Sequence, residues 1–260
     1  MHGLDRSTGT YLYTTRNKKR PESHAASSLR ARLAESYWRR CLSETARAVK
    51  DARLTYLSAA KLYRIERCLS EIDKARVEGD CVEFGVALGG SGVLIAKRMA
   101  GSRSFVGYDL FGTIPPPSDR DSLESHERYR VIASGRSSGI GGDTYYGYES
   151  NLFEKVKGSF TEFGVPVDDA RVRLVKGLFE ETVSFDNNVR IAFAHVDCDW
   201  YDPVALCLDR VYAHLAPGGI VVLDDYNDYG GCRKAVADFL ARRGDIHLAD
   251  PSHNAILRRI

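Results

Sequence analysis

The chain has 260 residues, of which 43% are hydrophobic and 28% are charged, with a net charge of only +2. This composition predicts one α/β domain of roughly 200 residues behind an N-terminal extension. The small net charge argues against a nucleic-acid partner, and no apolar run approaches the roughly 20 residues that span a bilayer. The six cysteines have no CxxC or zinc-type spacing and no signal peptide is evident, so we expect reduced thiols in a cytoplasmic protein without a membrane partner.

Residues 1–75 are expected to form an arm and helices that cover a site or a subunit interface. Residues 1–27 are polar, and residues 1–40 carry nine Lys or Arg against three acids. The pattern over 29–49 is helical, and apolar residues at 3.6-residue spacing predict another helix over 57–72. A basic arm can contact an anionic partner, but a solvated tail is commoner. We expect a homo-oligomer in which these helices are docking or exchange elements.

Residues 76–260 show the alternation of strands and helices that is typical of a doubly wound α/β domain. A strand over 81–85, a Gly-rich turn, a helix through 93–99 and a strand over 104–109 open the pattern. Residues 113–148 interrupt it with three successive prolines and five glycines. A long irregular insertion of this kind is expected to be a lid or a binding loop, or else disordered.

The alternation then resumes to the end of the chain. We expect strands at 172–175, 191–196 and 220–223, helices at 148–163, 203–214 and 232–242, and two short strands at 246–248 and 254–257. The sequence Pro217-Gly218-Gly219 is expected to end the helix over 203–214. The tight spacing of the last two strands predicts an antiparallel edge on an otherwise parallel sheet.

The turn after the first strand reads Glu83-Phe84-Gly85-Val86-Ala87-Leu88-Gly89-Gly90-Ser91. Its glycines allow a sharp turn and a close approach of the backbone to a ligand. A GxGxxG fingerprint would need glycine where Ala87 stands, which disfavours an NAD(P)-dependent oxidoreductase. The turn better suits S-adenosylmethionine (SAM), whose ammonium group needs a carboxylate such as Glu83. A packing turn without a ligand is the alternative.

Asp109 ends the second strand, directly after the Gly-rich turn and its helix. A carboxylate in this position accepts hydrogen bonds from ribose hydroxyls in nucleotide-binding folds. The following residues, Leu110 and Phe111, are then expected beside the ligand.

Acidic residues follow two further apolar strands. Asp197-Cys198-Asp199 comes after the strand over 191–196, and Asp224-Asp225 comes after the strand over 220–223. The interval leaves room for one crossover helix, which places the two strand ends side by side at the carboxyl edge of the sheet. Crowded carboxylates repel, and a hard divalent cation normally holds them together. We therefore predict a Mg²⁺ site at Asp197, Asp224 and Asp225. The alternative is helix capping, with Asp202 or Asp199 as the N-cap.

Taken together, these motifs resemble SAM-dependent methyltransferases of the macrocin O-methyltransferase type. The resemblance covers roughly residues 60–245 and includes the runs 108–112, 196–201 and 221–227. It implies a class I methyltransferase fold, which is a doubly wound, mostly parallel seven-stranded sheet with an antiparallel strand. It also implies methyl transfer from SAM, assisted by Mg²⁺, to a hydroxyl of a glycosylated natural product.

The resemblance also implies roles for individual residues. Asp199 would be the general base, and Asp197, Asp224 and Asp225 would bind the metal. SAM contacts are expected from Glu83, Gly85, Gly89, Gly90, Ser91, Asp109, Leu110 and Phe111. The chain departs from the family pattern at three positions. Cys198 stands where glycine is usual, and Asp202 stands where glutamate is common. Trp200 stands where some members have histidine. The alternatives are a metal-independent N- or C-methyltransferase and a non-catalytic SAM-binding scaffold.

Overall fold

The computed structural model describes residues 24–260, and most of the predicted arm, residues 1–23, lies outside the described residues. Glu35–Ile260 forms one compact unit, and the described residues 24–34 are not part of it. The helices that precede the sheet, from Glu35 on, therefore belong to the compact unit, while their role as a cover or an interface stays a prediction. None of the helices between residues 24 and 260 combines the length and apolarity needed to cross a membrane.

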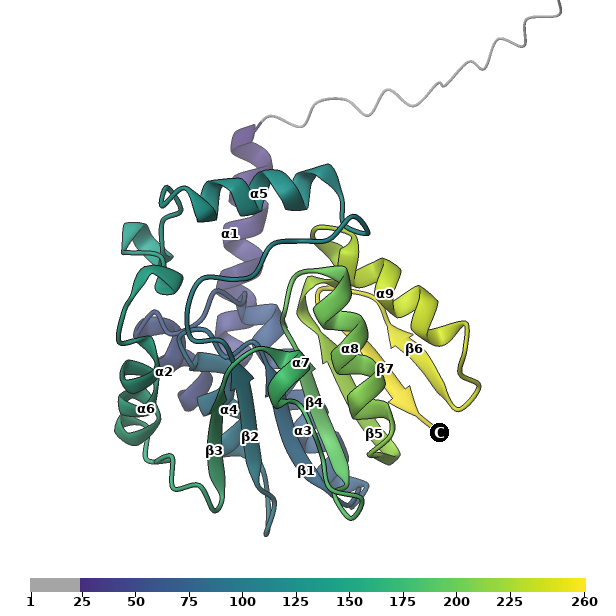
Figure 1. Cartoon of the computed structure of the whole chain (residues 1–260). Helices are drawn as coiled ribbons and strands as arrows, with labels where there is room; N and C mark the ends of the chain where they lie inside the picture. The colour runs from purple at the N-terminus through teal and green to yellow at the C-terminus, as the bar shows by residue number, and fades with distance from the viewer. Residues whose placement is uncertain (1–23) are drawn as a thin grey trace, which may run out of the picture. The chain divides into compact units, whose positions relative to one another are not determined.

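A seven-stranded sheet in the order β3-β2-β1-β4-β5-β7-β6 runs through the compact unit (Figure 1). Strands β1 to β5 pair in parallel, whereas β7 pairs antiparallel with both β5 and β6. This arrangement confirms the predicted fold class. The strands are β1 (Asp80–Phe84), β2 (Phe105–Asp109), β3 (Val172–Lys176), β4 (Ile191–Val196), β5 (Leu215–Leu223), β6 (Ile246–Asp250) and β7 (Ala255–Arg259).

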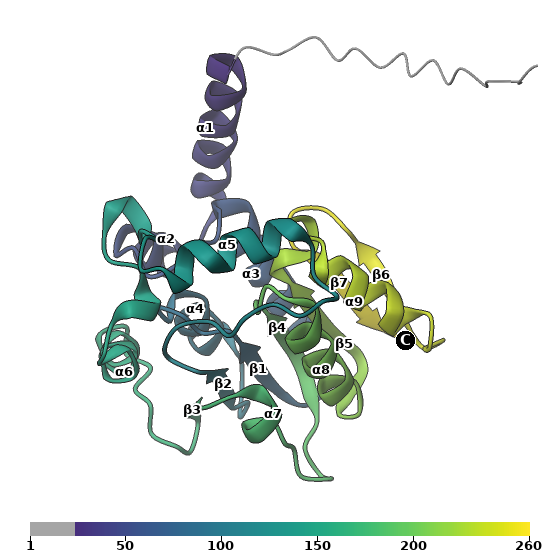
Figure 2. The same ribbon diagram turned by 45° about the horizontal axis from the view of Figure 1, so that its top comes forward.

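Helices cover both faces of the sheet (Figure 2). On β5, Ile220 and Val222 pack into the core beneath α3 and α4, whereas Val221 and Leu223 pack into the core beneath α8 and α9. This alternation follows from the two-residue period of a strand, which buries both faces of a parallel sheet. The helices are α1 (His24–Cys41), α2 (Glu44–Asp51), α3 (Ala59–Lys74), α4 (Gly90–Arg98), α5 (Leu123–Ala133), α6 (Leu152–Glu162), α7 (Phe179–Thr182), α8 (Tyr201–Tyr212) and α9 (Gly231–Leu240), with short 3₁₀ turns η1 (Ile140–Gly142), η2 (Tyr146–Tyr148) and η3 (Asp224–Asn227).

The helix predicted over residues 29–49 is two helices. Helix α1 ends at Cys41, and Ser43 starts α2 as its N-cap, with the hydroxyl accepting a hydrogen bond from the N–H of Ala46 at 3.1 Å. A serine side chain that satisfies a free N–H in this way favours a new helix start over continuation.

The Pro217-Gly218-Gly219 triplet does not end a helix, contrary to the prediction. Helix α8 ends at Tyr212, and the triplet lies inside β5. The register shifts around it, because Ile191 of β4 pairs with Leu215 whereas Phe193 pairs with Ile220. Extra residues in one strand of a pair form a bulge, and Gly218 with φ +77° accommodates it.

The insertion over residues 113–148 is less irregular than predicted, because its middle is helix α5. Ser122 caps that helix by accepting a hydrogen bond from the N–H of Ser125 at 3.3 Å. The insertion is tied to the segment between β4 and α8: the indole N–H of Trp200 donates to the carbonyl of Pro115 at 3.0 Å, and the N–H of Tyr201 donates to Asp121 at 2.8 Å. That it opens and closes as a lid stays a prediction.

Candidate active site

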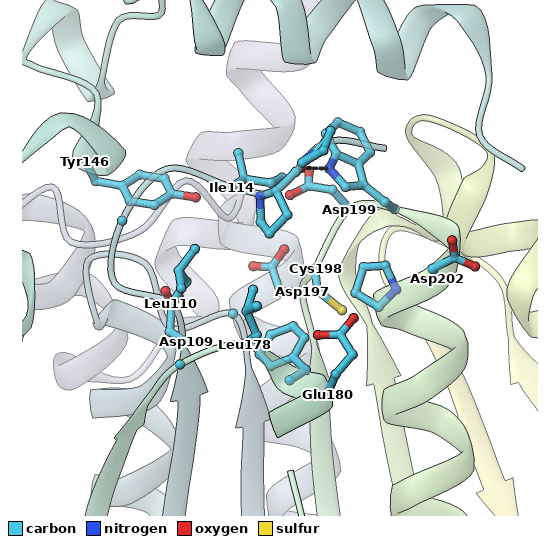
Figure 3. Close-up of a pocket in the computed structure, with 18 residues that line it drawn as sticks. Asp109, Leu110, Ile114, Tyr146, Leu178, Glu180, Asp197, Cys198, Asp199 and Asp202 are labelled. Atoms are coloured by element: carbon cyan, nitrogen blue, oxygen red, sulfur yellow. Dashed lines mark hydrogen bonds between the residues drawn. The ribbon is translucent and has the colours of Figure 1, made fainter. Parts of the chain in front are cut away.

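A cavity of about 370 Å³ lies at the carboxyl edge of the sheet (Figure 3). Strand order reverses between β1 and β4, and ligands bind at such a switch point in open α/β sheets. Apolar and acidic side chains face each other across the cavity, with Tyr146 entering from the insertion. The lining is Gly85, Asp109, Leu110, Gly112, Ile114, Pro115, Pro116, Tyr146, Gly177, Leu178, Phe179, Glu180, Asp197, Cys198, Asp199, Trp200, Asp202 and Pro203.

Gly85 brings the turn after β1 against the turn after β4. Its φ is +87°, and a Cβ at this position would lie 1.8 Å from the carbonyl oxygen of Asp197. Only glycine allows both the left-handed backbone and this contact. The predicted need for glycine at this position is therefore explained by the packing of two loops that both line the cavity.

Replacing Gly85 by Ala should lower the free energy of unfolding by about 3 kcal/mol or more and weaken SAM binding, because the two loops must separate. Urea denaturation and calorimetric titration with SAM would measure both effects. Gly101 is the matched control, since its φ is +66° but no atom lies within 4 Å of its Cβ position. Gly101→Ala should cost only about 1–2 kcal/mol and leave SAM affinity unchanged. Equal losses in the two variants would contradict the loop-contact explanation.

Asp109 lines the cavity but uses much of its carboxylate locally. Its Oδ2 accepts from the N–H groups of Val86 at 2.7 Å and Ala87 at 2.8 Å, and its Oδ1 accepts from Phe111 at 2.5 Å. Burial raises the pKa of Asp109, and these three donors oppose the rise. One lone pair of Oδ1 remains for a ligand, which favours contact with one ribose hydroxyl over two.

Glu83 does not line the cavity, and its contact with the SAM ammonium group stays a prediction. Its side chain is fully buried, with Oε1 2.9 Å from Nδ1 of His195. Burial raises the pKa of Glu83, and the His195 contact opposes the rise. Because Glu83 and His195 are register partners on β1 and β4, their side chains meet on one face of the sheet. The carboxylate therefore supports the sheet interior.

Of the other residues predicted to contact SAM, one lines the cavity and four do not. Leu110 lines the cavity, whereas Phe111 is buried against Phe153 at a ring distance of 4.9 Å. Gly89, Gly90 and Ser91 form the start of α4 and do not line the cavity. The N–H of Gly90 donates to the carbonyl of Leu54 at 2.9 Å. Contact of Phe111, Gly89, Gly90 and Ser91 with SAM stays a prediction.

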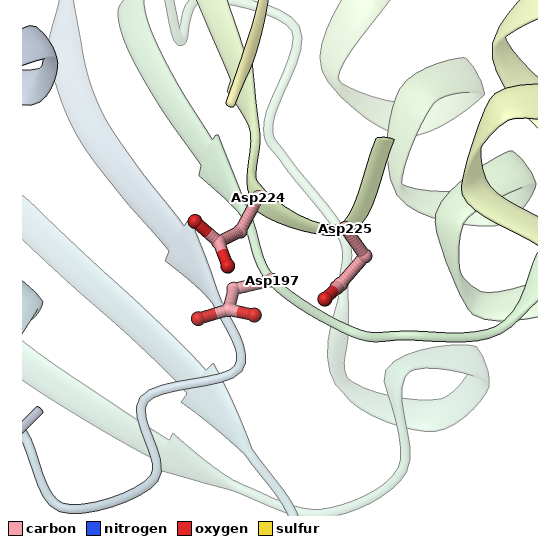
Figure 4. A group of neighbouring side chains, drawn as sticks. All are labelled: Asp197, Asp224 and Asp225. Atoms are coloured by element: carbon pink, nitrogen blue, oxygen red, sulfur yellow. The ribbon is translucent and has the colours of Figure 1, made fainter. Parts of the chain in front are cut away.

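Asp197, Asp224 and Asp225 meet next to this cavity, as their positions at neighbouring strand ends predicted. One oxygen from each carboxylate lies within 4.8 Å of the other two, and the three side chains point toward one another (Figure 4). Val196 of β4 pairs with Leu223 of β5, so the residues that follow them are neighbours.

The electrostatics of the three carboxylates fit a divalent cation. Burial and then the charge of Asp224 raise the pKa of Asp197 well above its usual range, and burial and then Asp199 do the same for Asp225. Oδ1 of Asp224 is buried and has no hydrogen-bond partner among residues 24–260. Clustered carboxylate oxygens, one of them unpartnered, are the donors that Mg²⁺ prefers.

Lys61 of α3 also reaches the acidic group. Its ammonium group donates to Oδ2 of Asp224 at 2.8 Å, to the carbonyl of Asp224 at 3.2 Å and to Asp228 at 3.3 Å. Burial alone would lower the pKa of Lys61, but Asp224 and then Asp228 raise it above its ordinary value. The lysine is therefore charged in this site.

Asp199 lines the cavity beside the acidic group. Its N–H donates to Oδ2 of Asp225 at 2.9 Å, and its φ is +58°. Burial and then the charge of Asp224 raise the pKa of Asp199 to about 6, whereas Arg128 of α5 lowers it. A carboxylate with a pKa near neutrality, facing a cavity, suits proton transfer.

The capping alternative for these acids is wrong. Helix α8 begins at Tyr201, and its N-cap residue is Trp200, whose side chain makes no capping hydrogen bond. Asp202 therefore lies inside the first turn, and Asp121 of the insertion accepts from the N–H of Tyr201 instead.

Several site residues were missed from the sequence. Lys61 precedes the apolar residue Leu62 of α3, and its place beside the buried face of that helix was the available signal. Leu178 and Phe179 begin α7, which was not predicted.

The sheet order, the antiparallel β7 and the cavity at the switch point define a class I SAM-dependent methyltransferase. Comparison with known proteins agrees, because the sequence matches the family Macrocin-O-methyltransferase (TylF) over residues 14–251. The chain belongs to this family and is a SAM-dependent methyltransferase.

Curated relatives and a solved structure extend this assignment. The chain is 28% identical over 207 residues, covering 76% of this chain and 70% of the relative, to 8-demethyl-8-(2,3-dimethoxy-alpha-L-rhamnosyl)-tetracenomycin-C 4'-O-methyltransferase of Streptomyces olivaceus. It is 26% identical to Mycinamicin III 3''-O-methyltransferase of Micromonospora griseorubida, covering 73% and 71% of the two chains. The structure of the O-methyltransferase NovP superposes with a TM-score of 0.65 at 22% identity, covering 79% of this chain and 81% of NovP, which supports the fold.

Proposed function

We propose that this enzyme transfers the methyl group of SAM to a hydroxyl group, on a sugar of a glycosylated natural product, with the help of Mg²⁺. Relatives named as O-methyltransferases of a rhamnosyl tetracenomycin and of mycinamicin III support the acceptor class. The observation that carries the proposal is the placement of Asp199, which lines the cavity directly beside the three clustered aspartates.

One group of residues would bind SAM and Mg²⁺, and Asp199 would transfer the proton. Asp109, Leu110 and the turn at Gly85 would hold the nucleoside at the switch point. Asp197, Asp224 and Asp225 would hold Mg²⁺, which when bound acidifies and orients an acceptor hydroxyl.

Asp199 would remove the hydroxyl proton as the oxygen forms its bond to the methyl carbon. The carbon–sulfur bond breaks in the same step, which leaves S-adenosylhomocysteine and a protonated Asp199. Holding the oxygen in line with the methyl group would also accelerate the reaction, because orientation removes an entropic cost.

Metal-independent transfer to nitrogen or carbon remains the alternative class. Incubation with methyl-labelled SAM and a panel of glycosylated natural products that includes tetracenomycins and mycinamicins, followed by mass spectrometry, would test the proposal. Label should enter a sugar hydroxyl, and a chelator should remove the activity until Mg²⁺ is restored. Full activity in the chelator would exclude the metal role, and label on nitrogen or carbon would exclude O-methylation.

A further inference from the structure

Lys61 stands inside a site that the proposed function reserves for a metal cation. It comes from α3, far from Asp224 in sequence, and its side chain is only 18% exposed. Its ammonium group contacts both the side chain and the backbone carbonyl of Asp224, and it also reaches Asp228. A lysine buried to this extent normally has a carboxylate partner, so this ion pair is part of the packed structure of the site.

The contacts of Lys61 distinguish the two oxygens of Asp224. Oδ2 accepts the ammonium hydrogen bond at 2.8 Å, whereas Oδ1 is buried and has no partner within the part of the chain that the structure describes. A carboxylate fixed through one oxygen has its orientation settled before any cation binds. The other oxygen is then the one that a metal would take, next to Asp197 and Asp225.

Lys61 also supplies positive charge to a group of buried acids. Asp224 and Asp225 are 7% and 6% exposed, so water screens their mutual repulsion poorly. A single ammonium group offsets part of this repulsion when no metal is bound. The same positive charge repels a divalent cation that binds a few ångströms away.

We propose that Lys61 is a positioning residue and a built-in counter-cation of the metal site. It orients Asp224 and stabilises the metal-free enzyme, and in doing so it makes Mg²⁺ binding weaker than three aspartates alone would allow. The proposal rests on the metal site of the proposed function. If Lys61 has this role, its positive charge and Mg²⁺ binding oppose each other, because both neutralise the same carboxylates.

The test measures Mg²⁺ binding to the SAM-free enzyme and needs no acceptor. Wild type, Lys61→Met and Lys61→Arg would be melted with and without MgCl₂ and titrated with MgCl₂ by calorimetry. Lys61→Met should melt at a lower temperature without Mg²⁺, gain more from Mg²⁺ than wild type, and bind Mg²⁺ about tenfold more tightly. Lys61→Arg keeps the charge and should retain the wild-type response to Mg²⁺.

Lys50 provides the matched control. Its side chain is 16% exposed and contacts the carbonyl of Leu57 at 2.7 Å and Glu35 at 3.0 Å, away from the acidic group. Lys50→Met should lose stability equally with and without Mg²⁺. If Lys61→Met does not fold without metal, Lys61→Gln serves the same comparison, because it removes the charge but keeps a donor.

The outcomes separate this proposal from the proposed function. Suppose that wild type responds to Mg²⁺ but that Lys61→Met and Lys61→Gln respond equally or more weakly. The counter-cation role would then be overturned, and the metal site would stand. A wild type that does not respond to Mg²⁺ at all would overturn both the metal site and the role of Lys61. Labelled methyl transfer in a chelator would then show independently whether the enzyme works without the metal.

Discussion

Asp224→Asn should reduce methyl transfer by about 10³-fold or more, while SAM affinity changes little. Metal coordination typically contributes several kcal/mol to stabilising the transition state, and each 1.36 kcal/mol is tenfold in rate. Removing the charge of Asp224 takes away a proposed metal ligand and also the nearer carboxylate partner of Lys61, which would be left buried near Asp197 and Asp225. SAM is expected to bind in the cavity, whose lining does not include Asp224.

Asp228→Asn is the matched control for this variant. Asp228 also contacts Lys61, at 3.3 Å, but its side chain is 49% exposed and it is not part of the three-aspartate group. Its turnover should stay within about threefold of wild type, because exposed ion pairs contribute little. Rates would be measured with saturating Mg²⁺, and binding of Mg²⁺ and SAM by calorimetry. Asp224→Asn with normal turnover, or a loss of equal size in Asp228→Asn, would remove the metal-ligand assignment.

The acidic group could be predicted because strand ends are positioned by topology. Val196 and Leu223 are register partners on β4 and β5, so the aspartates that follow them emerge at the same edge. A sequence that shows two buried strands joined by one crossover helix contains that information. No knowledge of side-chain packing was needed.

The side chain of Glu83 takes a direction that this reasoning does not give. It lies one residue before the end of β1, so its side chain points toward a face of the sheet and not toward the carboxyl edge. On that face it meets His195, its register partner. The motif places a carboxylate just before the Gly-rich turn, but the pleat of the strand sends its side chain into the interior.

Lys61 could not be predicted for a different reason. Its contact with Asp224 depends on how α3 packs across β4 and β5, and a place beside the buried face of the helix does not specify that packing. Within α3 the lysine sits among residues of an ordinary amphipathic helix. The same limit applies to Tyr146, whose direction is set by the packing of the insertion against the sheet edge.

Asp199→Asn should lower kcat by about 10²–10⁴-fold, the usual range for the loss of a general base. Asparagine is the informative substitution here because Asp199 has φ +58°, a left-handed conformation that Asn tolerates better than other residues with a Cβ. The N–H of residue 199 can still donate to Asp225, so the position of this proposed metal ligand should be preserved. The change therefore removes the proton acceptor and leaves the loop in place.

Binding measurements distinguish loss of the base from loss of the site. Asp199→Asn should keep the SAM affinity of wild type and still bind Mg²⁺, so its defect should appear in kcat with little change in KM. Asp202→Asn is the control, because Asp202 also lines the cavity but lies in the first turn of α8, with its side chain 50% exposed. It should retain most of the wild-type rate. If Asp199→Asn binds both ligands and still turns over normally, the proton must leave by another group, and the raised pKa of Asp199 would reflect only its burial among the acids beside it.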